Sequence, residues 1–191
     1  MVLAKHPLLD ALERTPRDGC RRDLVKGRII EMPPAWPRSS RAGVVLTFYL
    51  ELFCREHRLP YTVFGADAGL TIAEPAAPGL PPTVVSPDAS VVANAKLPPG
   101  DPPGFWSVVP DIAVEVLSPS DPWRDVQDKI DAYLEAGVPL LWIVDARSQS
   151  VSVYAPGQPT RTLRHQDDVL DGGAVWPDFR LRLRDIFERP S

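Results

Sequence analysis

The chain has 191 residues, a formal net charge of −4, 44% hydrophobic and 24% charged residues, and two cysteines. These values fit one globular domain and exclude a disordered chain, a disulfide framework and a four-cysteine zinc site. No apolar run of about 18 residues is present and charges interrupt the first 30 residues, so we expect no membrane span, no secretory signal and a cytoplasmic location.

The first half of the chain predicts a short helix, an extended pair, a long helix and short strands. Residues 8–15 read as a short helix within an N-terminal extension over residues 1–19, and a single domain is expected over residues 20–188. Residues 24–32, with Gly27 in the middle, predict two extended segments joined as in a hairpin. Ser39 or Ser40 can cap a helix that runs to about Arg58. Short strand candidates follow over residues 61–64, 70–72 and 90–92.

The clearest pattern lies between residues 110 and 145. Residues 112–117 form a near-continuous apolar run, which is typical of a strand buried on both faces of a sheet. Ser120 or Asp121 can cap the helix that follows, with Pro122 in its first turn and Gly137 at its end. A second apolar run closes on Asp145, so the segment predicts a right-handed βαβ crossover. A hairpin over residues 151–163 and a turn near residues 184–187 complete an α/β fold with a mixed sheet.

Two carboxylates stand out against this pattern. Glu115 lies inside the apolar run, where an isolated buried charge costs several kcal/mol unless it is paired, protonated or bound to a cation. Asp88 follows Pro87 where another strand enters the sheet. Each residue also has an ordinary explanation: Glu115 as a strand-end carboxylate held by amides or an arginine, and Asp88 as part of a simple turn.

Lys129 is the third candidate. It falls about 60° from Val126 on a helical wheel, at the edge of the buried stripe of its helix. The chain uses 17 Arg and 4 Lys, which favours a role that needs a compact ammonium. The ordinary alternative is an ion pair with Asp125, four residues earlier. Together, two carboxylates and this ammonium can converge on a divalent cation and a phosphate.

Residues 85–92 (VSPDASVV) and 110–120 (PDIAVEVLSPS) resemble the Uma-type restriction endonucleases, a bacterial branch of the PD-(D/E)XK nuclease superfamily. Lys129, Tyr133 and residues 141–145 (LWIVD) match the helix and strand that follow, and the resemblance covers about residues 20–188. It implies a restriction-endonuclease-like α/β (α+β) fold, with a mixed central β-sheet flanked by helices.

The resemblance also implies roles for individual residues. Asp88 matches the family's Pro-Asp aspartate and Glu115 its second metal-binding acid, while Glu31 matches an upstream acidic position. The superfamily lysine usually stands two residues after the second acid, where this chain has Leu117, so the resemblance moves that role to Lys129.

The leading hypothesis is an endonuclease that uses Mg²⁺ or Mn²⁺ to hydrolyse phosphodiester bonds. Asp88 and Glu115 would hold the metal, Lys129 would orient the nucleophile or neutralise the transition state, and Glu31 would assist. We expect nucleic acid, DNA in the first place, as substrate, and the superfamily makes a homodimer a plausible assembly. One alternative is a nuclease fold that binds nucleic acid or protein without turnover, and another is a hydrolase of small phosphates in a closed pocket.

The distribution of charge bears on how nucleic acid would bind. Residues 1–30 hold seven Lys or Arg against four Asp or Glu, whereas residues 31–160 hold eight against fifteen. The basic residues Arg17, Arg21, Arg22, Lys26 and Arg28 are therefore the first candidates for contacts with a phosphate backbone. Because much of the acid surrounds the candidate site, we expect binding to depend on metal.

Overall fold

A computed structural model describes residues 6–14, 20–75 and 80–188 of the chain. Its helices are α1 (Pro7–Glu13), α2 (Pro37–Glu56), the 3-10 turn η1 (Asn94–Lys96), α3 (Trp123–Glu135) and α4 (Leu183–Phe187). Its strands are β1 (Arg21–Val25), β2 (Arg28–Met32), β3 (Tyr61–Gly65), β4 (Leu70–Ala73), β5 (Thr83–Val85), β6 (Ala89–Ala93), β7 (Trp106–Ser107), β8 (Ile112–Leu117), β9 (Leu140–Asp145), β10 (Ser150–Tyr154), β11 (Arg161–Leu163), β12 (Val169–Gly172) and β13 (Trp176–Arg182). Within these residues no helix combines the length and hydrophobicity needed to cross a bilayer.

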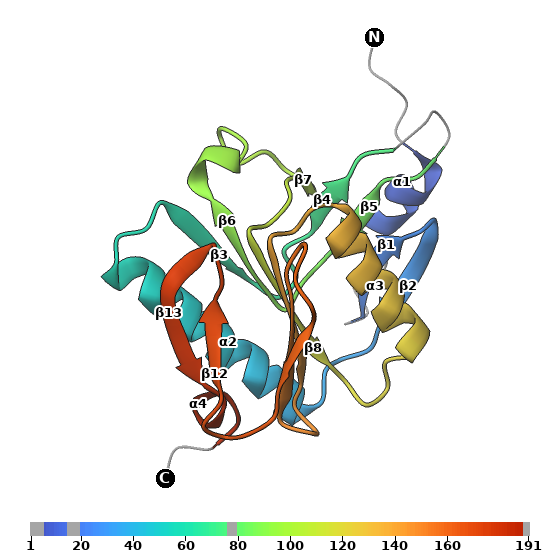
Figure 1. Ribbon diagram of the computed structural model, residues 1–191. Helices are drawn as coiled ribbons and strands as arrows, with labels where there is room; N and C mark the ends of the chain where they lie inside the picture. The colour runs from blue at the N-terminus through green and yellow to red at the C-terminus, as the bar shows by residue number, and fades with distance from the viewer. Residues whose placement is uncertain (1–5, 15–19, 76–79, 189–191) are drawn as a thin grey trace.

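The central sheet has six strands in the order β11-β10-β9-β8-β6-β3 (Figure 1). Strands β8 and β9 are parallel and joined through α3, whereas the other neighbours are antiparallel. The predicted βαβ crossover and mixed sheet are therefore confirmed, as is the predicted hairpin, which is formed by β10 and β11.

Strand β8 is buried because helices cover both faces of the central sheet. Its residues Ile112, Val114 and Val116 belong to the core cluster that includes the buried side of α2. Its alternate residue Ala113 belongs to the cluster that includes the buried side of α3. Since side chains alternate along a strand, Glu115 points toward α3. Figure 1 shows α2 and α3 on opposite sides of β8.

A second sheet, with the strand order β2-β1-β5-β4-β7, packs beside α3. The hairpin β1–β2 has Lys26 and Gly27 in its turn, both at positive φ, and confirms the predicted extended pair. The sequence predicts neither the separate sheet, with its strands β5 and β7, nor the pair β12–β13. These strands are short or lack a clear hydrophobic run.

Two predicted helix caps are wrong. Helix α2 begins at Pro37 after Trp36, and the hydroxyl of Ser39 instead donates to the carbonyl oxygen of Leu117 at 2.8 Å. Helix α3 begins at Trp123 after Pro122, and Asp121 accepts a hydrogen bond from the amide of Ser118 at 2.7 Å. A proline occupies the first position of α2 and the cap position of α3, and the two polar side chains bond instead to the end of β8 and to the residue that follows it.

Candidate active site

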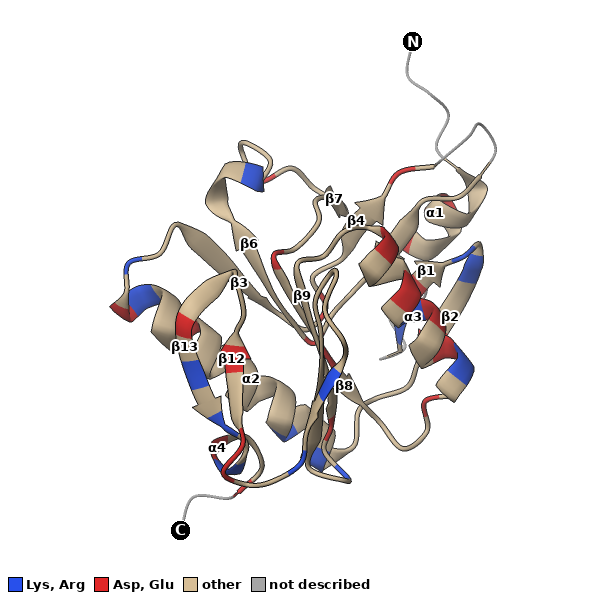
Figure 2. Ribbon diagram, viewed as in Figure 1, with Lys and Arg blue, Asp and Glu red and all other residues tan. Residues whose placement is uncertain are grey.

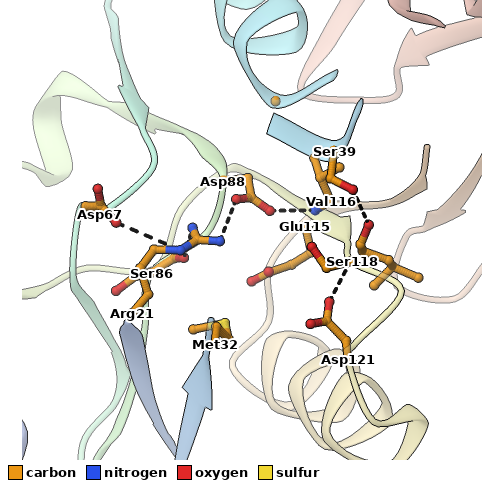
Figure 3. Close-up of polar contacts among 12 residues, drawn as sticks. Arg21, Met32, Ser39, Asp67, Ser86, Asp88, Glu115, Val116, Ser118 and Asp121 are labelled. Carbon is orange, nitrogen blue, oxygen red and sulfur yellow. Dashed lines mark hydrogen bonds and ion pairs between the residues drawn. The ribbon is translucent and has the colours of Figure 1, made fainter. Parts of the chain in front are cut away.

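The two predicted acids come from neighbouring strands of the central sheet. Asp88 stands just before β6, where its backbone amide donates to the carbonyl oxygen of Val114 at 2.9 Å. Its Oδ2 accepts a hydrogen bond from the amide of Val116 at 2.7 Å. Asp88 is thus bonded to the residues on either side of Glu115, and Figure 3 shows both carboxylates at this point. The pairing of β6 with β8 brings the two acids together, as the sequence predicts.

Lys129 joins Glu115 from the buried side of α3. Its Nζ lies 2.8 Å from Oε2 of Glu115, and its side chain is 8% exposed. The alternative ion pair with Asp125 does not form, since Asp125 bonds to Arg28 at 2.9 Å. The three main predicted site residues therefore converge from β6, β8 and α3.

Asp23, on β1, completes the environment of Lys129 and is not among the predicted site residues. It is fully buried, and its Oδ2 lies 2.7 Å from Nζ of Lys129. Its Oδ1 accepts a hydrogen bond from the amide of Ser86 at 2.8 Å. The signal available in the sequence was a carboxylate next to the apolar pair Leu24 and Val25, which resembles the context of Glu115.

Tyr133 is a second residue of the site that was predicted only as part of the apolar stripe. It lies one helical turn beyond Lys129, and its hydroxyl donates to Oε1 of Glu115 at 2.5 Å. Burial, followed by the charges of Glu115 and Asp23, raises the pKa of Tyr133 well above its usual value. The tyrosine therefore remains a neutral hydrogen-bond donor that fixes the orientation of Glu115.

The site has more negative than positive groups. Burial, and to a lesser extent the charges of Asp88 and Asp23, raise the pKa of Glu115 to about 7 against the opposing effect of Lys129. Burial alone would lower the pKa of Lys129, but the charges of Asp23 and Glu115 raise it above its usual value. Arg21 is the second cation, with Nη2 at 2.8 Å from Oδ1 of Asp88 (Figure 3). Three carboxylates are thus paired with two cations, and the carboxylate of Asp121, which lines the same cavity, adds to the negative side.

Glu31 lies at the edge of this arrangement. Its side chain is 63% exposed, and its Oε1 bonds to Nε of Arg22 at 2.9 Å. It lines the same cavity as Asp88, Glu115 and Lys129, but no hydrogen bond or ion pair is found between it and these residues in the described part of the chain.

Two hollows of different size meet at Asp88. The cavity around Asp88, Glu115 and Lys129 has a volume of about 40 Å³, which suits an ion and a few waters. A neighbouring open groove of about 760 Å³ runs along α2, and Arg21, Met32 and Asp88 line both hollows.

A further buried carboxylate lies elsewhere: Asp111, just before β8, bonds to Nζ of Lys96 at 2.7 Å, away from the site. Among the described residues, no group of three or more His, Cys, Asp or Glu is placed to hold a metal ion.

Comparisons with known proteins point in the same direction as this geometry. The chain matches a solved structure described as a putative nuclease from Anabaena variabilis, with 21% identity, a TM-score of 0.78, and coverage of 94% of this chain and 96% of that one. At this identity the likeness shows the fold, which is the predicted one. None of the curated proteins compared matches the chain. A family model described as "Putative restriction endonuclease" matches residues 9–184, and the chain therefore belongs to this family, Uma2.

Proposed function

We propose that the protein is a metal-dependent endonuclease that hydrolyses phosphodiester bonds of nucleic acid, DNA in the first place. The observation that carries the proposal is the convergence of Asp88, Glu115 and Lys129, from three separate elements, at the end of an open groove. A buried ammonium bonded to one of two adjacent carboxylates supplies both the metal ligands and the positive charge that phosphodiester hydrolysis requires.

The residues present fit a hard divalent cation. Asp88 and Glu115 offer carboxylate oxygens, the ligands that Mg²⁺ and Mn²⁺ prefer, and Mg²⁺ usually keeps several waters, so two carboxylates suffice. The carboxylates outnumber the cations and leave an excess of negative charge that a divalent ion would offset. When bound, the ion would neutralise phosphate charge and lower the pKa of a water ligand.

The other roles in the reaction would fall to side chains of the protein. Lys129, held between Asp23 and Glu115, keeps its ammonium at the end of β8, where it can orient the attacking water or neutralise the transition state. Tyr133 holds the second oxygen of Glu115 and so fixes that carboxylate. Glu31, at the rim of the cavity, can assist only at its exposed edge.

The shape of the site favours a polymeric substrate over a small phosphate. A hydrolase of small phosphates would need a closed pocket of some hundreds of Å³ around the acids. Here the cavity at the acids holds about 40 Å³ and opens beside a groove of about 760 Å³. One phosphodiester of a long strand can lie next to the acids while the rest of the strand lies outside this small cavity.

The test is nicking of supercoiled plasmid with Mg²⁺ or Mn²⁺ by the wild type and by Glu115→Ala and Lys129→Ala. We expect cleavage by the wild type and at least a roughly hundredfold lower rate for each variant, because each loses a group that acts on the reacting phosphate. Lys96→Ala is the matched control, since Lys96 also bonds to a buried aspartate but lies away from the site. Cleavage that survives both site substitutions would contradict the proposal.

Metal binding can be measured without turnover. Mn²⁺ should raise the melting temperature of the wild type and leave that of Glu115→Ala unchanged, because only the folded wild type has both ligands. A wild type that shows no shift at millimolar Mn²⁺ and leaves every plasmid intact would favour the non-catalytic binding module instead.

A further inference from the structure

The basic residues of the N-terminal segment are largely neutralised by carboxylates. Lys26 bonds to Asp128 and Asp131, at 3.2 and 3.0 Å, across the gap between the β1–β2 hairpin and α3. Arg28 bonds to Asp128 on the same helix at 2.8 Å. Figure 2 shows this row of acidic residues on α3 facing the basic residues of the hairpin. Arg21 is paired with Asp88, and Arg17 lies outside the described residues. This side of the site therefore offers little free positive charge to a phosphate backbone.

The opposite side of the site carries guanidinium groups without carboxylate partners. Arg38 in the first turn of α2 and Arg147 after β9 are exposed, and neither forms an ion pair with any described residue. The guanidinium of Arg41 donates to the carbonyl oxygens of Ile186 and Glu188 and forms no ion pair with a carboxylate of the described residues. Asp145 lies near Arg147, but it accepts hydrogen bonds from the backbone amides of Arg147 and Ser148.

An exposed tryptophan lies among these arginines. Trp36, just before α2, is 58% exposed, although an indole of this size is usually well buried. Trp36, Arg38 and Arg147 line one hollow of about 530 Å³, which is large enough for a nucleotide. We call these three residues the Trp36 surface.

The Trp36 surface is continuous with the site. Ser39 lines its hollow and donates to the carbonyl oxygen of Leu117, two residues beyond Glu115. Leu117 pairs with Asp145 in the parallel register of β8 and β9, and Arg147 follows Asp145 by two residues. From strand geometry, Arg147 lies on the order of 10 Å from Glu115. At about 3.4 Å per nucleotide, the spacing in B-DNA, this distance corresponds to at most about three nucleotides, because an unpaired strand is more extended.

We propose that the Trp36 surface binds an unpaired nucleic-acid strand on one side of the scissile phosphate. Arg38 and Arg147 contact its phosphates, and the indole of Trp36 stacks on a base. A base inside a double helix has both faces covered by its neighbours, so the indole needs an unstacked base, as in a single-stranded segment, and we place that segment within about three nucleotides of the cut. The inference rests on the proposed function and adds a substrate class to it.

The experiment measures binding of two fluorescein-labelled oligonucleotides, a 20-nucleotide oligothymidylate and a blunt duplex, by anisotropy in Ca²⁺. Trp36→Ala should weaken binding of the single strand by roughly fivefold or more, with a much smaller effect on the duplex. Arg38→Ala/Arg147→Ala should lower the slope of log K against log salt by about 1.4 on the single strand, because two phosphate contacts are lost. Arg58→Ala is the control, since Arg58 is exposed, has no ion pair among the described residues and lies about 30 Å away beyond the other end of α2.

The outcomes separate this inference from the proposed function. If the wild type binds and cleaves while the Trp36 surface variants behave like Arg58→Ala, the surface is wrongly assigned and the nuclease proposal stands. Equal losses on duplex and single strand for Trp36→Ala would overturn the stacking contact. A wild type that neither binds nor cleaves either oligonucleotide would overturn both.

Discussion

Lys129 is the central residue of the site, because its buried ammonium is stable only between two carboxylates. Removing one partner of a buried ion pair typically costs about 3–5 kcal/mol, since the remaining charge is left uncompensated. With Asp23 and Glu115 at 2.7 and 2.8 Å, Lys129 has little freedom to move. We therefore expect Asp23 to be a positioning residue that acts on the proposed reaction through Lys129.

This role predicts the effect of Asp23→Asn. The amide oxygen can still accept the hydrogen bond from Ser86, but Lys129 loses one of its two charged partners. We expect a plasmid-nicking rate roughly 10- to 100-fold lower, because a small displacement of the ammonium is enough to weaken its contact with the reacting phosphate. The Mn²⁺ concentration for half-maximal rate should change little, since both proposed ligands remain.

Asp111→Asn is the matched control for this variant. Asp111 is also a buried aspartate with a lysine at 2.7 Å and a backbone amide at 2.8 Å, but its partners are Lys96 and Ala93. Asp23→Asn should lower the melting temperature more than Asp111→Asn, because the side chain of Lys129 is 8% exposed and that of Lys96 is 41% exposed, and only Asp23→Asn should slow cleavage. Equal nicking rates for the two variants would show that Asp23 is merely structural.

At this scale the sequence is informative where a charge interrupts a regular pattern. Glu115 stands inside a long apolar strand and Lys129 at the edge of an apolar helix stripe, so both could be predicted. Asp23 could not, because its strand is short and its neighbours Arg21 and Arg22 hide its burial. Its partnership with Lys129 depends on the packing of a second sheet against α3, which no local pattern encodes.

At the scale of elements, the contact of α2 with the central sheet sets the position of Asp88. Gly43 lies on the buried side of α2, where a Cβ atom would be 3.8 Å from Cβ of Asp88 and 3.9 Å from Cγ2 of Val116. Both distances are ordinary van der Waals contacts. A methyl group therefore fits, whereas a larger side chain would press on Asp88.

Gly43→Ala should accordingly stabilise the protein. Replacing a glycine inside a helix with alanine increases the free energy of unfolding by up to about 1 kcal/mol, which corresponds to roughly 2–4 °C in melting temperature at this chain length. The Mn²⁺-induced shift in melting temperature should be retained in Gly43→Ala and lost in Gly43→Leu, which would displace the carboxylate. A lower melting temperature for Gly43→Ala would mean that α2 packs on the sheet more tightly than these distances indicate.

Elements with a long run of apolar residues could be predicted from the sequence. Short strands that form only by pairing with distant parts of the chain could not. The βαβ unit of β8, α3 and β9 has runs that are apolar enough to identify each element. Strand β7 has two residues and pairs with a strand more than 30 positions earlier. Strand β7 exists only through its pairing in the second sheet, so no local pattern of the sequence predicts it.

At the scale of the whole molecule, a net charge of −4 opposes binding to a polyanion. The ion pairs of Lys26 and Arg28 with α3 add to this opposition, because they use basic residues that could otherwise face phosphates. In the proposed reaction, the excess carboxylate around Glu115 would repel the scissile phosphate from the place where it must react. A divalent ion at Asp88 and Glu115 would make this local charge more positive by two units.

Binding of nucleic acid should therefore depend on metal, even when nothing is cleaved. With the labelled oligothymidylate at fixed ionic strength, we expect Ca²⁺ to tighten binding by roughly tenfold or more relative to EDTA, because two unit charges act at close range in a partly buried site. In Glu115→Ala the affinities in Ca²⁺ and in EDTA should nearly coincide, since that variant lacks one of the two ligands. Equal affinities for the wild type in the two buffers would mean that the arginines of the Trp36 surface overcome the acidic site without help from a cation.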